Sequence, residues 1–188
     1  MPVTGRWRNP LSCYTGYMSA IKELVRLEVC GDPADVIVAF LNTLDVEQGA
    51  DAIDTLDGWA SWLCDQGLDG CFGRQDGDDL ERARELRGDL RALVSGEPVQ
   101  GGQVEIALGL SAGGQVGLSA PTASGFLGAA AAMVAIQKRF DRLKICPADN
   151  CRWAFYDTSR NRSRQWCSMK VCGNRAKARA HRQRISSP

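Results

Sequence analysis

The chain has 188 residues, of which 44% are hydrophobic and 24% charged, and this composition excludes a wholly disordered protein. The length predicts one domain, or one domain with a small appended module. The net charge of +1 hides two unlike parts: residues 1–137 carry 9 Lys and Arg against 19 Asp and Glu, whereas residues 138–188 carry 14 against 3. An acidic body with a basic end predicts a module that binds a polyanion.

No segment of the sequence predicts membrane insertion or export. The longest apolar run, Phe126 to Ile136, has eleven residues, whereas a helix that crosses a bilayer needs roughly 20. The first residues open no long apolar stretch, so we expect no secretory signal. We therefore expect a cytoplasmic protein whose thiols stay reduced.

The first part of the chain is predicted to be helical. Apolar residues at helical spacing predict one helix over residues 19–29. Asp32 is a good N-cap and Pro33 a good first helical residue, so a second helix is expected to run from there to about Leu44. Four cysteines scattered through this part show no metal-like pairing and are interpreted as small buried hydrophobes. They are Cys13, Cys30, Cys64 and Cys71.

Two more helices are predicted before residue 100. Asp51 is expected to start the third helix, which ends near Gly67. Its apolar face comprises Leu56, Trp59 and Leu63. Asp76 is expected to cap the fourth helix, which Gly96 and Pro98 terminate. Its apolar stripe comprises Leu80, Ala83, Leu86, Leu90 and Leu93.

The pattern then alternates with the period of a β-strand. Apolar residues alternate on both sides of a Ser-Ala-Gly-Gly turn, which predicts a β-hairpin near residues 103–120. An Ala-rich run predicts a buried helix from Ala123 to about Leu143 that leads directly into the last segment. The expected fold is thus mainly α, a helix-rich α+β body over residues 1–143, with a separate module over residues 144–188.

The module carries two pairs of cysteines with matching spacing. Cys146 and Cys151 are separated by four residues, and so are Cys167 and Cys172, with fifteen residues between the pairs. Two closely spaced thiolate pairs suit a tetrahedral Zn²⁺ ion, and the neighbouring cations favour thiolates. Disulfides or buried thiols are the alternatives. Four sulfurs fill the coordination shell, so one structural zinc per chain is predicted, with no position for a reactive water.

The residues between the two pairs are expected to form a hairpin with a basic tip. Residues 152–156 are strand-like, and Arg160, Arg162 and Arg164 would lie at the tip. Ser168 is a plausible N-cap for a helix that runs to about Arg184. A turn that carries the first cysteine pair (the knuckle), a hairpin, and a helix that begins at the second pair follow one another in the order typical of a treble-clef-like module. Its aromatic residues are expected to form a small core over the metal rather than to stack on bases.

The final helix has almost no face to bury. Only Val171, Ala178 and Ile185 form a thin apolar strip, and no acidic residue follows Asp157. Such a helix is expected to lie against nucleic acid, with a solvated helix or an acidic protein surface as the alternatives. The candidate contacts to nucleic acid are Arg160, Arg162, Arg164, Asn174, Arg175, Lys177, Arg179, Arg182 and Arg184. His181 is interpreted as another polar residue of this helix.

Residues 146–184 resemble the CGNR zinc-finger family, whose name matches Cys172-Gly-Asn-Arg175. The run from Phe155 to Met169 also resembles that family. The body resembles the ABATE-type domain, through Phe40-Leu-Asn-Thr-Leu and residues 80–94, whereas the segment before residue 30 departs from it. The resemblance implies a bacterial, stress-induced transcription regulator with a DNA-binding finger. It places the metal-ligand role on the four cysteines of the module and assigns no catalytic residue.

The leading functional hypothesis is a regulator that binds double-stranded DNA, with a homodimer on two half-sites as a plausible form. The alternatives are an RNA-binding module and an adaptor that docks on an acidic protein. No enzyme is predicted, because the sequence contains neither a nucleophile–His arrangement nor a phosphate loop. Asn42 and Thr43 are candidates for a polar sensor site, although a hydrogen bond at a helix end is the better interpretation. Cys64 and Cys71 are weaker candidates for redox sensing.

Overall fold

The computed structural model describes residues 31–68, 71–72, 75–99, 101–110 and 116–186. The elements of the body are α1 (Pro33–Leu41), β1 (Leu44–Asp45), β2 (Ala50–Asp51), α2 (Leu56–Asp65), α3 (Gly77–Ser95), β3 (Ala107–Leu110), β4 (Val116–Ser119) and α4 (Ala123–Ile136). They are followed by a 3₁₀ turn (Phe140–Arg142), β5 (Leu143–Ile145), β6 (Ala154–Tyr156), a π-helical turn (Met169–Gly173) and α5 (Asn174–Ser186). The helix predicted over residues 19–29 lies outside the described residues.

Polar side chains cap the helices where the sequence offers them. Asp32 caps α1 and Asp76 caps α3, and Gly96 ends α3 in the left-handed conformation, with φ of +73°. These predictions are confirmed. The expected start of α2 at Asp51 is wrong, because Thr55 caps that helix and Asp51 lies in β2, paired with Leu44. The helix expected to run to about Leu44 ends at Leu41, because Leu44 lies in β1 and pairs with Asp51.

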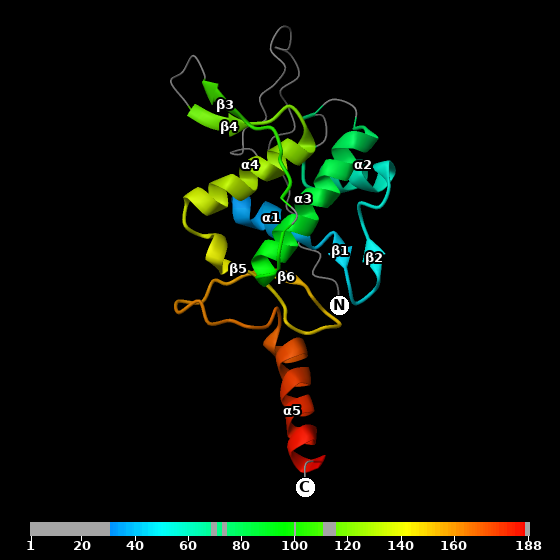
Figure 1. Ribbon diagram of the computed structural model, residues 1–188, viewed down its shortest axis with the longest axis vertical. Coiled ribbons are helices and arrows are strands. Elements are labelled where there is room, and N and C mark those ends of the chain that lie inside the picture. The colour runs from blue at the N-terminus through cyan, green and yellow to red at the C-terminus, as the bar shows by residue number, and fades with distance from the viewer. Residues whose placement is uncertain (1–30, 69–70, 73–74, 100, 111–115, 187–188) are drawn as a thin grey trace.

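Helices α1, α3 and α4 pack around the main core, with α2 beside them (Figure 1). The largest fully buried side chains there include Trp59, Phe40 and Phe126. α4 is buried on nearly every side, and a Cβ at Gly128 would clash with the side chain of Val104, so only glycine allows this close approach. Of the scattered cysteines, Cys71 is partly buried and Cys64 is exposed, so the expected burial is wrong for Cys64, and Cys13 and Cys30 lie outside the described residues.

Each of the three described sheets is a two-stranded antiparallel hairpin. In the predicted hairpin Leu110 pairs with Val116, so the two strands are confirmed, whereas the turn predicted between them lies outside the described residues. The prediction that α4 continues to Leu143 is wrong. The helix ends at Ile136 and Lys138 takes a φ of +55°, after which Leu143 pairs with Tyr156 in β5–β6.

The strand β6 corrects a second prediction. Residues 152–156 were expected to pair with the segment that returns to Cys167, but Ala154 pairs with Ile145 of β5 instead. The first cysteine pair therefore lies in the connection between β5 and β6, and the basic segment beyond Tyr156 is a loop. β5 spans the expected boundary at residues 143/144, so the chain passes from body to finger through a shared hairpin.

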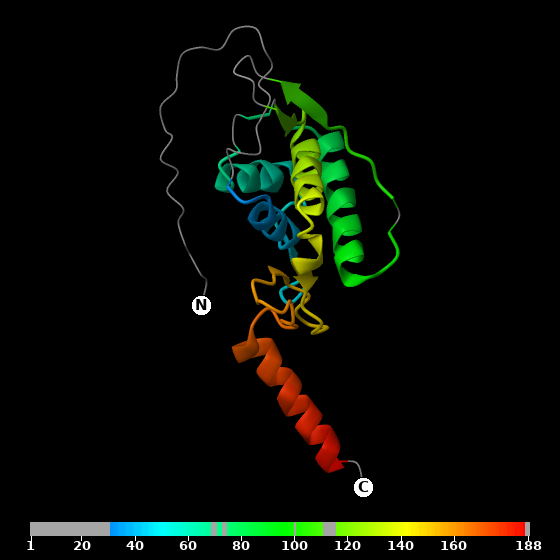
Figure 2. The same ribbon diagram turned by 90° about the vertical axis from the view of Figure 1, so that its left-hand side faces the viewer.

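The finger, residues 142–186, lies at one end of the body, and α5 extends away from it (Figures 1 and 2). The other end of the molecule holds the β3–β4 hairpin and the amino-terminal end of α4. Among the described helices, none is both long and apolar enough to cross a membrane.

Candidate metal centre and nucleic-acid surface

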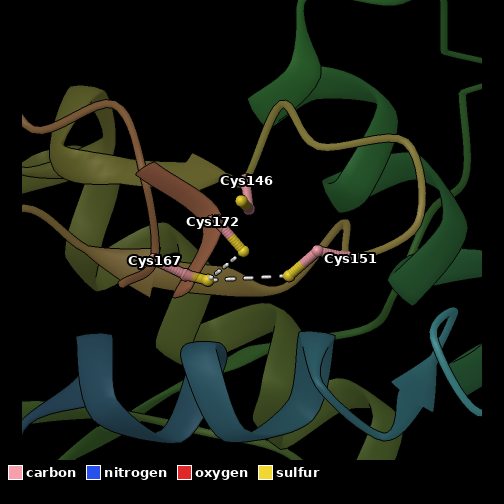
Figure 3. Close-up of side chains that lie close together, drawn as sticks. All are labelled: Cys146, Cys151, Cys167 and Cys172. Carbon is pink, nitrogen blue, oxygen red and sulfur yellow. Dashed lines mark hydrogen bonds between the residues drawn. The ribbon is translucent and has the colours of Figure 1, made fainter. Parts of the chain in front are cut away.

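The four predicted ligand cysteines come together in one cluster (Figure 3). Cys146 and Cys151 lie in the turn between β5 and β6, Cys167 precedes the π-helical turn, and Cys172 lies within it. All four Sγ atoms lie within 4.8 Å of one another, with 3.5 Å between those of Cys151 and Cys167 and 3.7 Å between those of Cys167 and Cys172. Cys146 is fully buried and Cys167 is half-buried.

Backbone hydrogen bonds shape the turn that holds the first pair. The amide of Cys146 donates to the carbonyl of Trp153, and the amides of Cys151 and Arg152 both donate to the carbonyl of Ala148. Arg152 takes a left-handed φ of +52° and so closes this knuckle. The second pair is set by Ser168, whose Oγ accepts from the amide of Val171 at the start of the π-helical turn.

The sulfur cluster has the chemistry that zinc requires. Zn–S bonds of about 2.3 Å in a tetrahedron place the sulfurs about 3.8 Å apart, close to the separations seen here. The four cysteines thus form a site for one zinc ion and leave no ligand position for water. The metal would supply cross-linking of the two pairs, while the chain supplies four sulfur donors in a mostly buried setting.

The cysteine thiols differ in how readily they ionise. Burial opposes ionisation of Cys146, but backbone amides of Cys167 and Ala148 that donate to its sulfur keep its pKa below the usual value. Burial and the other three sulfurs raise the pKa of Cys167, whereas burial and the sulfurs of Cys151 and Cys146 raise the pKa of Cys172 to about 11. Of these three thiols, that of Cys146 is therefore the most readily ionised, and binding of a cation would displace protons from the thiols of Cys167 and Cys172.

Part of the predicted aromatic core is confirmed. Phe155 is buried against the cysteines, and Trp166 packs beside it. Tyr156 instead packs on the main core and its hydroxyl accepts a hydrogen bond of 2.9 Å from Arg139. Trp153 is exposed. Two aromatic rings and four sulfurs are a small core, so the metal has a large share in the stability of the finger.

Asp157 organises the loop after β6, a role that sequence reasoning missed. Its carboxylate is fully buried and accepts from Lys144 Nζ at 2.6 Å and from the amides of Ser159 and Arg164 at 2.9 Å each. Burial works to raise the pKa of Asp157, but the hydrogen bonds outweigh it and hold that pKa well below its usual range. The available signal was that Asp157 is the last acidic residue in a strongly basic segment.

Some predicted nucleic-acid contacts are already engaged within the molecule. The guanidinium of Arg164 lies 4.7 Å from the centre of the Phe155 ring and donates to the carbonyls of Trp166 and Cys167. Arg162 pairs with Asp141, and Asn174 donates to the carbonyl of Lys170. These three side chains therefore contribute to contacts within the protein.

The remaining predicted contacts lie at the surface of the finger. Arg175, at the start of α5, forms an ion pair of 3.0 Å with Glu47, which lies between β1 and β2. The other basic candidates are exposed, and all but one lie on α5, which points into solvent (Figure 2). They are Arg160, Lys177, Arg179, Arg182 and Arg184.

The body holds the finger through Asn42, the residue that ends α1. Its side chain donates to the carbonyl of Ala154 at 2.9 Å and accepts from the amide of Ala154 at 2.7 Å, as a neighbouring strand would. Arg91 adds hydrogen bonds to the carbonyls of Leu41 and Arg152. The Thr43 hydroxyl donates to Phe40 and accepts from Arg87. Both polar candidates for a sensor site therefore serve internal hydrogen bonding.

Replacing Asn42 with alanine is expected to lower the free energy of unfolding by about 2–3 kcal/mol, because Ala154 would keep a buried donor and acceptor without partners. Urea unfolding of the full chain measures the change. Asn161→Ala, at an exposed position, is the control and should stay within about 0.5 kcal/mol of the original chain. Equal stability of Asn42→Ala and Asn161→Ala would contradict the docking role.

Comparison with known proteins agrees with this geometry. Residues 142–185 match the family described as CGNR zinc finger, and residues 34–137 match the family described as "Putative stress-induced transcription regulator", or ABATE. Both families are regulator or zinc-finger types rather than enzyme families. The search of curated proteins finds no match. Because the second match spans more than half of the chain, the chain belongs to the ABATE family and carries a CGNR zinc finger after that domain.

Proposed function

We propose that the chain is a DNA-binding transcription regulator of the bacterial cytoplasm, in which a zinc-organised finger presents a basic helix to double-stranded DNA. The observation that supports this most directly is the charge of the segment after Asp157, which holds nine Lys and Arg and no acidic residue. On α5, Lys177, Arg179 and Arg184 are exposed, and within the described residues no acidic side chain pairs with them.

Phosphate is the ligand that suits this surface. Each cation that neutralises a phosphate releases condensed counterions, so the affinity rises without any need for a base contact. Arg160 on the loop and the cations of α5 are the proposed phosphate contacts. Asn174, exposed at the first position of α5, is the proposed contact to a base edge. A single finger reads few base pairs, and a homodimer on two half-sites would supply the further specificity.

Neutralising Arg179 and Arg182 together is expected to weaken binding to every duplex sequence alike. Two lost phosphate contacts lower affinity roughly thirtyfold near 0.15 M salt and reduce the slope of log K against log salt by about 2. Fluorescence anisotropy with labelled genomic fragments measures both quantities. Arg82→Ala, which removes an exposed cation from α3, is the matched control and should leave binding unchanged. Indifference of the affinity to the double substitution would contradict the proposal.

Competition decides between the nucleic-acid classes. Duplex DNA, single strands and structured RNA are offered to the same labelled complex at one salt concentration. The proposal predicts that duplex DNA competes best. Better competition by structured RNA would favour an RNA-binding module, and failure to retain any nucleic acid at physiological salt would favour an adaptor for an acidic protein.

A further inference from the structure

The cations of α5 lie in two rows with a narrow, weakly apolar strip between them. At about 100° per residue, Lys177 and Arg179 lie on opposite sides of Ala178. The cations of the first row are Lys177 and Arg184, with His181 between them, and those of the second row are Arg175, Arg179 and Arg182. Ala178 and Ile185, seven residues apart, form the strip between the rows. The helix therefore carries positive charge on both sides of the strip rather than on one face only.

The rows are accessible along the length of the helix. Residues 177–185 of α5 are all exposed, and the side chain of Ile185 is 72% exposed. The ion pair of Arg175 with Glu47 joins only the start of the helix to the body. Beyond it α5 projects away from the rest of the molecule in both views (Figures 1 and 2). Its 13 residues span about 20 Å, roughly six base pairs of B-form DNA.

We propose that α5 lies in the major groove of duplex DNA, with Ala178 and Ile185 toward the base edges and the two rows against the two phosphate backbones. This inference rests on the proposed function and specifies how the same surface binds. The major groove is about 12 Å wide and admits an α-helix with its side chains. Phosphates then flank the helix on both sides, which is the arrangement that two opposed rows fit.

Other binding modes leave one row unused. A single phosphate backbone or a flat acidic protein surface faces one side of a helix only. The minor groove of B-form DNA is about 6 Å wide, and the major groove of A-form RNA is deep and narrow, so neither admits this helix. In the proposed mode the small Ala178 permits close approach, and its methyl group and the side chain of Ile185 are apolar contacts suited to thymine methyl groups.

The same substitution made at two positions tests the orientation. Ala178→Glu places a negative charge between the rows, and Ala180→Glu places the same charge on the opposite side of the helix, about 200° away. Both positions are exposed. With the zinc-loaded full chain and a labelled duplex, we expect Ala178→Glu to weaken binding at least about tenfold more than Ala180→Glu does. Circular dichroism and zinc content confirm that both variants are folded. Equal losses would overturn the inference.

The two rows are then tested separately. Lys177→Ala with Arg184→Ala, and Arg179→Ala with Arg182→Ala, are each expected to weaken duplex binding about tenfold or more. An effect confined to one row would overturn the groove mode while leaving DNA binding intact. A dye that binds the major groove should also displace the protein from the duplex, whereas a drug that binds the minor groove should not. The reverse result would overturn the major-groove binding mode. Absence of duplex binding by the unaltered chain is a different result, because it overturns the proposed function itself.

Discussion

A chain with Cys146→Ser and Cys172→Ser is expected to lose its zinc and the fold of its finger. One sulfur is removed from each pair, so neither pair can complete a tetrahedral site. The remaining core of the finger consists mainly of Phe155 and Trp166. In zinc-finger peptides, metal binding supplies folding free energy on the order of 10 kcal/mol, and a core this small cannot replace it.

Elemental analysis of the purified protein measures the metal, and we expect about one zinc per chain to fall to nearly none. Amide hydrogen exchange should show loss of protection in residues 142–173 and retention in α1, α3 and α4. Cys64→Ser is the matched control, since this thiol is exposed on α2 and lies outside the cluster. A double variant that keeps its zinc would show that the ion is held elsewhere.

Replacing Asp157 with asparagine is expected to lower the free energy of unfolding by about 2–3 kcal/mol at neutral pH. The amide keeps the shape of the carboxyl group but removes the charge that Lys144 and the two backbone amides contact. Because the carboxyl group is fully buried, water cannot take its place as the acceptor for the amides of Ser159 and Arg164. Urea unfolding of the zinc-loaded chain measures the change, with Asp149→Asn, at an exposed position of the knuckle, as the control.

The pH dependence of this difference follows from the direction of the shift. The folded-state pKa of Asp157 is depressed below the unfolded value of about 3.9, so its contribution is present above that value and declines as pH falls through the folded-state pKa. The stability gap between the original chain and Asp157→Asn should therefore be constant from pH 5 to 7 and narrow only below about pH 4. A gap that narrows between pH 7 and 5 would contradict this assignment.

The parts of the fold that could be predicted are those determined by residues close to one another in the sequence. Asp32-Pro33 and Asp76 predicted two helix starts, and the caps form as expected. The cysteine spacing predicted the metal cluster, because two short-spaced pairs need only one reversal of the chain to meet. The alternation around the Ser-Ala-Gly-Gly turn predicted the β3–β4 hairpin.

The sequence-based predictions are wrong where a residue distant in the sequence determines the local structure. Asp51 has the composition of a helix start, but its carboxylate accepts two hydrogen bonds of 2.6 Å from Arg87 on α3. Ala154 pairs with β5 because Asn42, 112 residues away, completes the other side of that strand. Arg164 has the sequence context of a phosphate contact, yet two backbone carbonyls and the Phe155 ring receive its guanidinium. Composition alone does not show such inward-facing cations.

The position of the finger gives the body a mechanical role in the proposed activity. Asn42 and Arg91 fix β6 and the knuckle against α1 and α3, so the metal cluster is built on a rigid support. The ion pair of Arg175 with Glu47 then sets the direction in which α5 leaves that support. From there α5 extends away from the body (Figure 1).

The most direct test is the salt dependence of duplex binding by the full-length, zinc-loaded chain, compared with the same protein after chelation. If a zinc-organised finger presents about five cations to phosphates, affinity should fall by a factor on the order of 10² to 10³ between about 50 and 200 mM salt. Chelation should abolish binding at the lower salt concentration. Duplex affinity that is independent of salt, or that survives complete removal of the metal, would contradict the central claim.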